Sequence, residues 1–209
     1  MVRRITRNQP FYGSRLEREC KGQMRLIADD TDVDVKTIRH AEMRREELRK
    51  QTQAGRPPQR IVLVACAAQK LETPARAADL YTSPLFRRAR EFAEAHADAW
   101  YILSALHGLL DPERVTAPYD FTLKECNRRE REQWAWGVIS ELRSAAPPRS
   151  HVIILAGNLY REHLEYDLTR YGYTVEVPTR GMGIGQQLHF LITETQKTGR
   201  RSSALITEA

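Results

Sequence analysis

Short apolar runs alternate with amphipathic stretches from residue 60 to residue 197. Four runs have the length and β-branched content of buried strands; they occupy 60–66 (RIVLVAC), 100–103 (WYIL), 151–156 (HVIILA) and 173–177 (YTVEV). Apolar positions recur at helical spacing in the segments between and after these runs, at 84–97, 124–145, 161–171 and 184–197. Strands that alternate with helices predict a three-layer α/β domain with a mainly parallel central sheet.

A helical module precedes this domain. Apolar residues over 23–50 have the inward spacing of two helices, and 31–34 (TDVD) supplies turn and N-cap residues between them. The segment is similar to a helix-turn-helix, whose second helix would present to the DNA major groove the side chains of Lys36, Thr37, Arg39 and His40. The alternative is a helical hairpin that packs on the main domain. Because 51–59 (QTQAGRPPQ) has the composition of a linker, we expect a basic helical module at 1–58 and the α/β domain at 59–209.

The charge of the chain is concentrated in this front module. The formal net charge is +6, and residues 1–60 carry 15 basic and 9 acidic side chains, so the excess lies entirely within them. A basic module ahead of a neutral domain indicates a polyanionic partner such as DNA. A basic, solvated arm is the alternative.

The composition excludes several other classes of protein. The content of 41% hydrophobic residues supports a real core, and no run approaches the 18 apolar residues of a membrane span. The basic N-terminal segment lacks the apolar stretch of a secretory signal. The three cysteines are far apart and form no CxxC pair, so neither a disulfide framework nor a zinc site is expected. We expect a cytoplasmic protein that needs no metal or cofactor; the oligomeric state is left open.

The candidate chemistry follows the predicted strands. In an open parallel α/β sheet, ligands bind at the carboxyl ends of the strands. The four strand ends here deliver the segments CAAQK, SALHGLL, AGNLY and PTRGMGIGQQ. If the sheet is parallel, these segments lie along one edge, and we expect them to surround a single pocket.

Four blocks of the sequence carry a resemblance to known families. In chain order they are 66–70 (CAAQK), 79–90 (DLYTSPLFRRAR), 103–120 (LSALHGLLDPERVTAPYD) and 181–190 (GMGIGQQLHF). The third resembles a segment of the peroxide-stress family YaaA. All four, in order, are similar to a family of uncharacterised bacterial and phage domains. This chain departs from that pattern at Ala67-Ala68, where Ser often follows the Cys, and at Leu106, where Lys is common.

The wider group is similar to the uracil-DNA-glycosylase fold and to the nucleic-acid-binding domains of archaeosine synthases. Some relatives are thought to remove modified bases from DNA, including phage DNA. The resemblance therefore implies that the chain handles a nucleobase in DNA or RNA. A base-excising enzyme breaks an N-glycosidic bond, and duplex DNA must first release the base into a pocket.

Such a reaction needs a carboxylate, and a polar group for the departing base. Asp120, which follows Pro118 and Tyr119, is the first candidate carboxylate; a solvated turn or a helix N-cap is the alternative. Asp111, before Pro112, is the second, with a turn role as the alternative. His107 and Asn158 are candidates to stabilise the leaving base. Their alternatives are a core histidine bonded to backbone and a residue in a left-handed turn.

Further residues at the strand ends are candidates for binding. The small residues after the first strand let backbone approach a ligand, Tyr119 or Tyr160 can stack on a flipped base, and the glycine-rich turn can place free N–H groups near a phosphate. The alternatives are core cover for the two tyrosines, a tight turn and close packing for the glycine-rich turn, and helix capping for Gln186. The predicted substrate-binding set is Cys66, Ala67, Ser104, Tyr119, Tyr160, Arg180, Gly183 and Gln186, and Lys70 is predicted to contact DNA.

These expectations combine into a DNA N-glycosylase that excises a modified base by water attack, with Asp120 as the activating carboxylate and modified phage DNA as one candidate substrate. Two alternatives stay open. One is a regulator or nucleobase sensor that binds without chemistry, and the other is a transglycosylase that exchanges one base for another.

Overall fold

The computed structural model describes residues 43, 44, 47 and 55–207, with their side chains up to residue 198. From Gly55 onward the chain forms one compact unit. Apart from Met43, Arg44 and Glu47, which are helical and exposed, the predicted helix-turn-helix lies outside the described residues. Its proposed DNA contacts, Lys36, Thr37, Arg39 and His40, also lie outside them.

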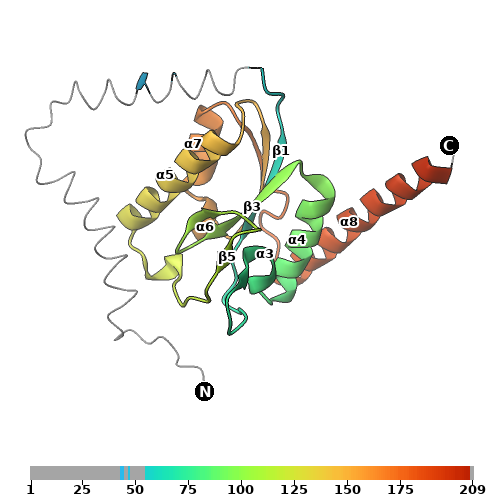
Figure 1. Cartoon of the computed structure of the whole chain (residues 1–209), viewed down its shortest axis with the longest axis horizontal. Helices are drawn as coiled ribbons and strands as arrows, with labels where there is room; N and C mark the ends of the chain where they lie inside the picture. The colour runs from blue at the N-terminus through green and yellow to red at the C-terminus, as the bar shows by residue number, and fades with distance from the viewer. Residues whose placement is uncertain (1–42, 45–46, 48–54, 208–209) are drawn as a thin grey trace, which may run out of the picture. The chain divides into compact units, whose positions relative to one another are not determined.

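A five-stranded sheet forms the centre of this unit, in the order β4-β3-β1-β6-β7 (Figure 1). Strands β3, β1, β6 and β7 are parallel to one another, and β4 runs antiparallel to β3. The strands are β1 (Arg60–Ala65), β3 (Ala99–Ser104), β4 (Gly108–Leu110), β6 (His151–Leu155) and β7 (Thr174–Glu176). The prediction of an α/β domain with a mainly parallel central sheet is confirmed.

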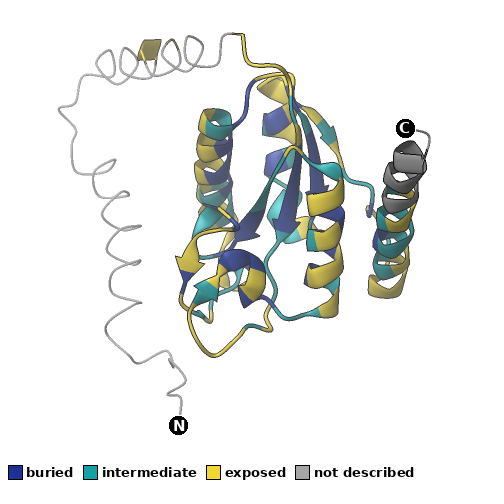
Figure 2. Cartoon of the chain, turned by 45° about the vertical axis from the view of Figure 1, so that its right-hand side comes forward, coloured by how far each residue is buried: buried dark blue, intermediate teal, exposed yellow. Residues whose placement is uncertain are grey.

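Helices cover both faces of the sheet, and the strands between them are buried (Figure 2). One face packs its alternate residues, such as Val62, Val64 and Ile102, against α4 and α8. The other packs Ile61, Leu63 and Ile154 against α5 and α7. The helices are α4 (Pro84–His96), α5 (Arg128–Ala145), α7 (Leu164–Arg170) and α8 (Ile184–Thr207). Continuous apolar strands such as 60–65 occur because both sides of the sheet are covered.

The order of the strands places a topological switch at β1. The chain moves from β1 to β3 on one side of it, and then crosses to β6 on the other side. In sheets of this kind the crevice for a ligand lies outside the carboxyl ends of the strands at such a switch. The segments after β1 and β6 therefore flank the expected place for a ligand.

Several boundaries differ from the sequence-based prediction. Between the strand predicted at 100–103 and the helix predicted at 124–145, no strand is predicted. This segment contains β4 and also β5 (Val115–Thr116), which pairs with β2 (Ala75–Arg76). A short helix, α3 (Ala77–Leu80), follows β2. Strand β4 forms because Gly108 takes a positive φ of 70°, which returns the chain and buries Leu110 beside Ile102.

The predicted helices also shift at their ends. The helix expected from residue 124 begins at Arg128, because the Asn127 side chain accepts the Glu130 N–H and Glu130 accepts the Asn127 N–H in a capping box. A 3₁₀ turn, η1 (Leu123–Glu125), precedes it. In place of the single helix expected at 161–171, the structure has two short helices, α6 (Asn158–Arg161) and α7.

Candidate functional site

Ser104 is the buried centre of the candidate site. It is the last residue of β3 and has no exposed surface. Its Oγ is hydrogen-bonded to the Tyr119 hydroxyl at 2.8 Å and accepts the His107 N–H at 3.0 Å. Its carbonyl accepts the indole N–H of Trp134, on α5, at 2.9 Å. Ser104 therefore fastens the 104–119 segment to the sheet and to a helix.

Two tyrosines extend this network. The hydroxyls of Tyr81 and Tyr119 are 2.9 Å apart and hydrogen-bonded. Burial raises the pKa of both phenols above the ordinary value. The three hydroxyls of Tyr81, Tyr119 and Ser104 thus form a protonated, buried chain just beyond the carboxyl ends of β1 and β3.

Lys70 lies over the rings of these tyrosines. Its Nζ is 4.4 Å from the centre of the Tyr119 ring and 5.7 Å from that of Tyr81, within the range of cation–π attraction. Its backbone is fixed by a β-bridge to Tyr81. Burial lowers the pKa of the amine, and the charges of Cys66 and Asp120 oppose this shift. Lys70, which is predicted to contact DNA, is thus half-buried beside two aromatic rings.

Cys66 and Tyr160 join the two sides of the switch. The Cys66 Sγ, just after β1, is 3.2 Å from the Tyr160 hydroxyl, which follows β6. The Tyr160 ring meets Trp134 edge to face, with centroids 5.5 Å apart. Ala67 is half-buried against the core on the α4 side. The structure therefore brings Cys66, Ala67, Ser104, Tyr119 and Tyr160 to one edge of the sheet, as their places at strand ends suggest.

His107 is held by the same segment. Its Nε2 is hydrogen-bonded to the hydroxyl of buried Thr116 at 3.1 Å, and its ring meets Tyr119 edge to face at 5.4 Å. Burial lowers the pKa of the imidazole, and the positive charge of Arg114 lowers it further. The neutral ring is therefore the favoured form near neutral pH. With Nε2 bound to Thr116, Nδ1 is the nitrogen left for a ligand.

Asp120 differs from its neighbours in being exposed. It follows half-buried Tyr119 directly, and its charge acts on Lys70. Within residues 55–198 no hydrogen bond or ion pair engages its carboxylate, whereas Asp79 and Asp98 are both engaged. A solvent-accessible carboxylate thus directly follows Tyr119, the ring over which the half-buried Lys70 amine lies.

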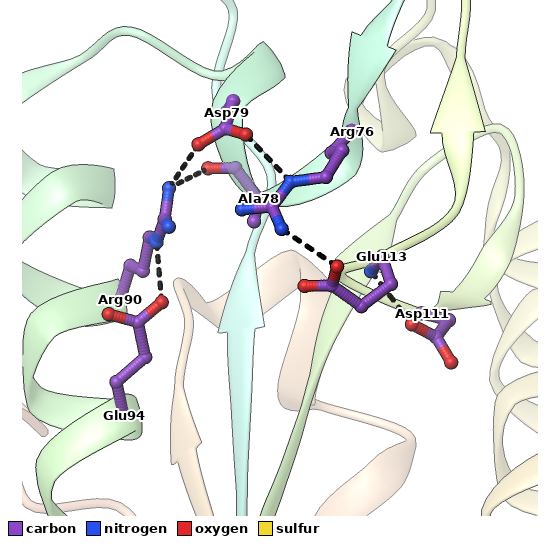
Figure 3. A network of polar contacts seen from close by, with 7 residues as sticks. All are labelled: Arg76, Ala78, Asp79, Arg90, Glu94, Asp111 and Glu113. Atoms are coloured by element: carbon purple, nitrogen blue, oxygen red, sulfur yellow. Dashed lines mark hydrogen bonds and ion pairs between the residues drawn. The ribbon is translucent and has the colours of Figure 1, made fainter.

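Asp111 is not brought to this site. It lies in the turn after β4, where its carboxylate accepts the Glu113 N–H at 2.8 Å. Glu113 in turn pairs with Arg76 at 2.8 Å, and Arg76 pairs with Asp79 at 2.9 Å (Figure 3). This network ties the turn to β2 and α3. The turn role that was the alternative reading accounts for Asp111.

The four remaining candidates have local structural partners; they are Asn158, Arg180, Gly183 and Gln186. Asn158 is exposed at the start of α6, and its Nδ2 is 3.4 Å from the Glu162 carboxylate. Arg180 pairs with Glu165, on α7. Gln186 accepts the Gly183 N–H at 2.9 Å and so caps α8. Asn158 alone among the four follows a strand that borders the switch.

A shallow hollow lies beside the capped end of α8. It has a volume of about 480 Å³ and is lined by Gln186, His189 and Phe190 among others. None of the residues around Ser104 lines it. We therefore place the candidate site at the hydroxyl network and not in this hollow.

Three residues of the network were missed in the sequence. Tyr81 lies in the 79–90 block, which carried the resemblance but suggested no site role. Trp134 is part of the apolar stripe of α5, so its indole N–H was not considered. Thr116 has no sequence signal, because its contact with His107 depends on the pairing of β5 with β2.

The structure offers no metal centre in the part that it describes. Among these residues no group of three His, Cys, Asp or Glu side chains could hold a metal ion. None of the helices described there is long and apolar enough to cross a membrane.

Comparisons with known proteins give a match over most of the α/β domain that contains this site. A model described as a family of unknown function, DUF6884, matches residues 61–193. The uncharacterized protein YfjM of Bacillus subtilis (strain 168) is 26% identical over 142 residues, which are 59% of this chain and 95% of that protein. No solved structure is significantly similar to the chain. The matched residues include the whole network around Ser104.

Proposed function

The chain belongs to DUF6884, a family of unknown function, and we propose from the geometry of its site that it is a DNA N-glycosylase that removes a modified base. The observation that carries the proposal is the exposed Asp120 carboxylate, next to the buried hydroxyl chain and Lys70 at the carboxyl edge of the sheet. Base excision needs this combination of an accessible carboxylate and a surrounding of fixed polar groups.

Asp120 has the central chemical role in this proposal. As the base departs, C1′ of the sugar gains positive charge, and a nearby carboxylate stabilises that charge or accepts a proton from the attacking water. The carboxylate is exposed and forms no hydrogen bond with the described residues, so it is available for either task.

The neutral imidazole of His107 is proposed to stabilise the leaving base. Its Nε2 bond to Thr116 fixes the ring, and Nδ1 remains for a contact with a base nitrogen or oxygen. Asn158 is a second candidate, because it follows β6 at the switch and its side chain has a single, long hydrogen bond. Either residue would act on a base that has been extruded from the duplex.

The proposal includes a fold of the uracil-DNA-glycosylase type and a phosphate-binding role for the basic residues before position 60. Support for the fold is the parallel sheet with helices on both faces. The excess of positive charge in the segment before position 60 supports the phosphate-binding role. DNA from phages that carry modified bases is the substrate source that we propose.

Release of free base tests the proposal. Purified full-length chain is incubated with a panel of unmodified and modified phage DNAs, and free bases and abasic sites are measured by mass spectrometry. We expect release from at least one modified DNA, and a loss of about 100-fold or more in Asp120→Asn, as when a catalytic acid or base is removed.

Asp111→Asn is the matched control for this experiment. Its amide oxygen can still accept the Glu113 N–H, so the turn is kept while a carboxylate is lost. We expect its rate to equal that of the unchanged protein. No release from any DNA of the panel, or equal losses in the two variants, would contradict the proposal.

A further inference from the structure

Lys70 has an environment that a phosphate contact does not require. Its side chain is half-buried, and its Nζ makes one long hydrogen bond, of 3.4 Å, to the Ala68 carbonyl. It has no ion pair within 4.0 Å among the described residues, whereas Lys197 pairs with Glu194 at 2.7 Å. The rings of Tyr81 and Tyr119 lie beside the amine.

These features are those of a nucleophilic amine. A lysine that binds phosphate is usually solvated and stays charged, whereas a lysine that attacks carbonyl carbon must lose its proton first. Burial against the two rings disfavours the charged form and lowers the pKa of Lys70. The β-bridge to Tyr81 holds the backbone of Lys70 in place, so that the amine is directed by a rigid element.

We propose that Lys70 forms an imine with C1′ of the abasic deoxyribose and so gives this chain an abasic-site lyase activity. The inference rests on the proposed function, because the abasic sugar is the product of base removal and lies in the same site. It adds a second reaction, cleavage of the DNA strand, to the removal of the base.

The open-chain abasic sugar has an aldehyde at C1′; the neutral Nζ adds to it, and loss of one water gives the imine, which is protonated. The Asp120 carboxylate takes a proton from C2′, and the electron pair expels the 3′ phosphate, which breaks the C3′–O bond. Water then hydrolyses the conjugated imine and returns the free amine of Lys70. No oxidant, reductant or metal is consumed.

Trapping with borohydride tests this step without knowledge of the natural base. The full-length chain is mixed with a synthetic duplex that contains one preformed abasic site, in the presence of sodium cyanoborohydride, which reduces an imine to a stable secondary amine. We expect a covalent protein–DNA adduct that peptide mass spectrometry places at Lys70. We also expect strand cleavage 3′ to the abasic site when the reductant is left out.

Two variants separate the nucleophile from a charge that only binds DNA. Lys70→Arg keeps a positive charge, so it should bind the abasic duplex but give no adduct. Lys124→Arg, which changes an exposed lysine in η1, should leave the adduct yield unchanged. Thermal unfolding of each variant shows whether it has folded.

The outcomes distinguish this inference from the proposed function. Absence of an adduct, or an adduct mapped to another amine, overturns the inference even if free base is released. An adduct at Lys70 without base release from any DNA supports the imine chemistry and leaves the glycosylase proposal as the part that fails. An adduct that persists in Lys70→Arg also overturns the inference.

Discussion

At the scale of single residues, the site depends on hydroxyl groups that are buried together. Ser104, Tyr119 and Tyr81 satisfy one another, and removal of one hydroxyl leaves the others short of a partner. An unsatisfied buried polar group costs more than an average hydrogen bond contributes. The network thus stabilises the fold and also fixes the ring on which Lys70 lies.

Tyr119→Phe should therefore lower the free energy of unfolding by about 2 kcal/mol, because two buried hydroxyls lose a partner. Urea denaturation measures this loss. Tyr166→Phe is the matched control, since Tyr166 is 69% exposed and its hydroxyl is in water; it should have no measurable effect. Equal stability of Tyr119→Phe and the unchanged protein would show that the network contributes nothing.

His107 should give the stability a specific dependence on pH. Its folded-state pKa lies below the ordinary 6.5, so the unfolded chain takes up a proton first as the pH falls. The contribution of His107 is therefore complete above pH 6.5 and is lost as the pH falls toward the folded-state value. Relative to His107→Gln, the unchanged protein should be more stable by about 1 kcal/mol at pH 7.5, and this difference should narrow at pH 5.5. A difference that widens would contradict the assignment.

At the scale of elements, α5 connects the core to the site. Its Val138, Ile139 and Leu142 pack on the sheet, and its Trp134 donates to the carbonyl of Ser104. The capping box at Asn127 sets where the helix starts and hence the position of Trp134, two turns later. The stability of this cap should therefore affect the site as well as the fold.

Asn127→Ala should cost about 1 kcal/mol of unfolding free energy, because the Glu130 N–H loses its acceptor. Asn127→Ser is the control, since a serine side chain can accept the same bond. Both are measured by urea denaturation, with tryptophan fluorescence as a second signal. A cost in the serine variant equal to that in the alanine variant would mean that the side chain is not acting as a cap.

The four parallel strands were predictable because continuous apolar runs such as 151–155 have few other uses. Strand β4 was not, because it has three residues and depends on the positive φ of Gly108 and on the Glu141 carboxylate, which accepts the Leu109 N–H. The start of α5 was misplaced because the capping residues Asn127 and Glu130 were not considered.

The candidate site, like the fold, was predictable from the sequence only in part. Residues at the ends of strands, such as Ser104 in β3 and Cys66 just after β1, come together because the carboxyl ends of parallel strands share one edge. Asp111 does not join them, because β4 carries the chain back along β3, away from that edge. Tyr81 and Thr116 could not be found, since their contacts with the site arise from pairings between distant short segments.

At the scale of the whole molecule, the charge is divided between a basic front segment and a neutral domain. If the front segment binds phosphates, its contribution to DNA affinity should depend on salt and not on the base. The full-length double variant Lys36→Ala, Arg39→Ala should reduce the slope of log Kd against log salt by about 2, at roughly 0.9 for each phosphate contact. Fluorescence anisotropy over a salt series measures this slope, and an unchanged slope would contradict the phosphate-binding role.

The central claim is that Asp120 and its neighbours form a site for a sugar cation at the carboxyl edge of the sheet. Affinity for two duplexes tests it most directly, one with a cationic pyrrolidine and one with neutral tetrahydrofuran in place of a single nucleotide. Transition-state analogues bind at least about 100-fold more tightly than ground-state ligands, so we predict a strong preference for the pyrrolidine that Asp120→Asn abolishes and Asp111→Asn keeps. Equal affinity of the unchanged protein for both duplexes would contradict the account.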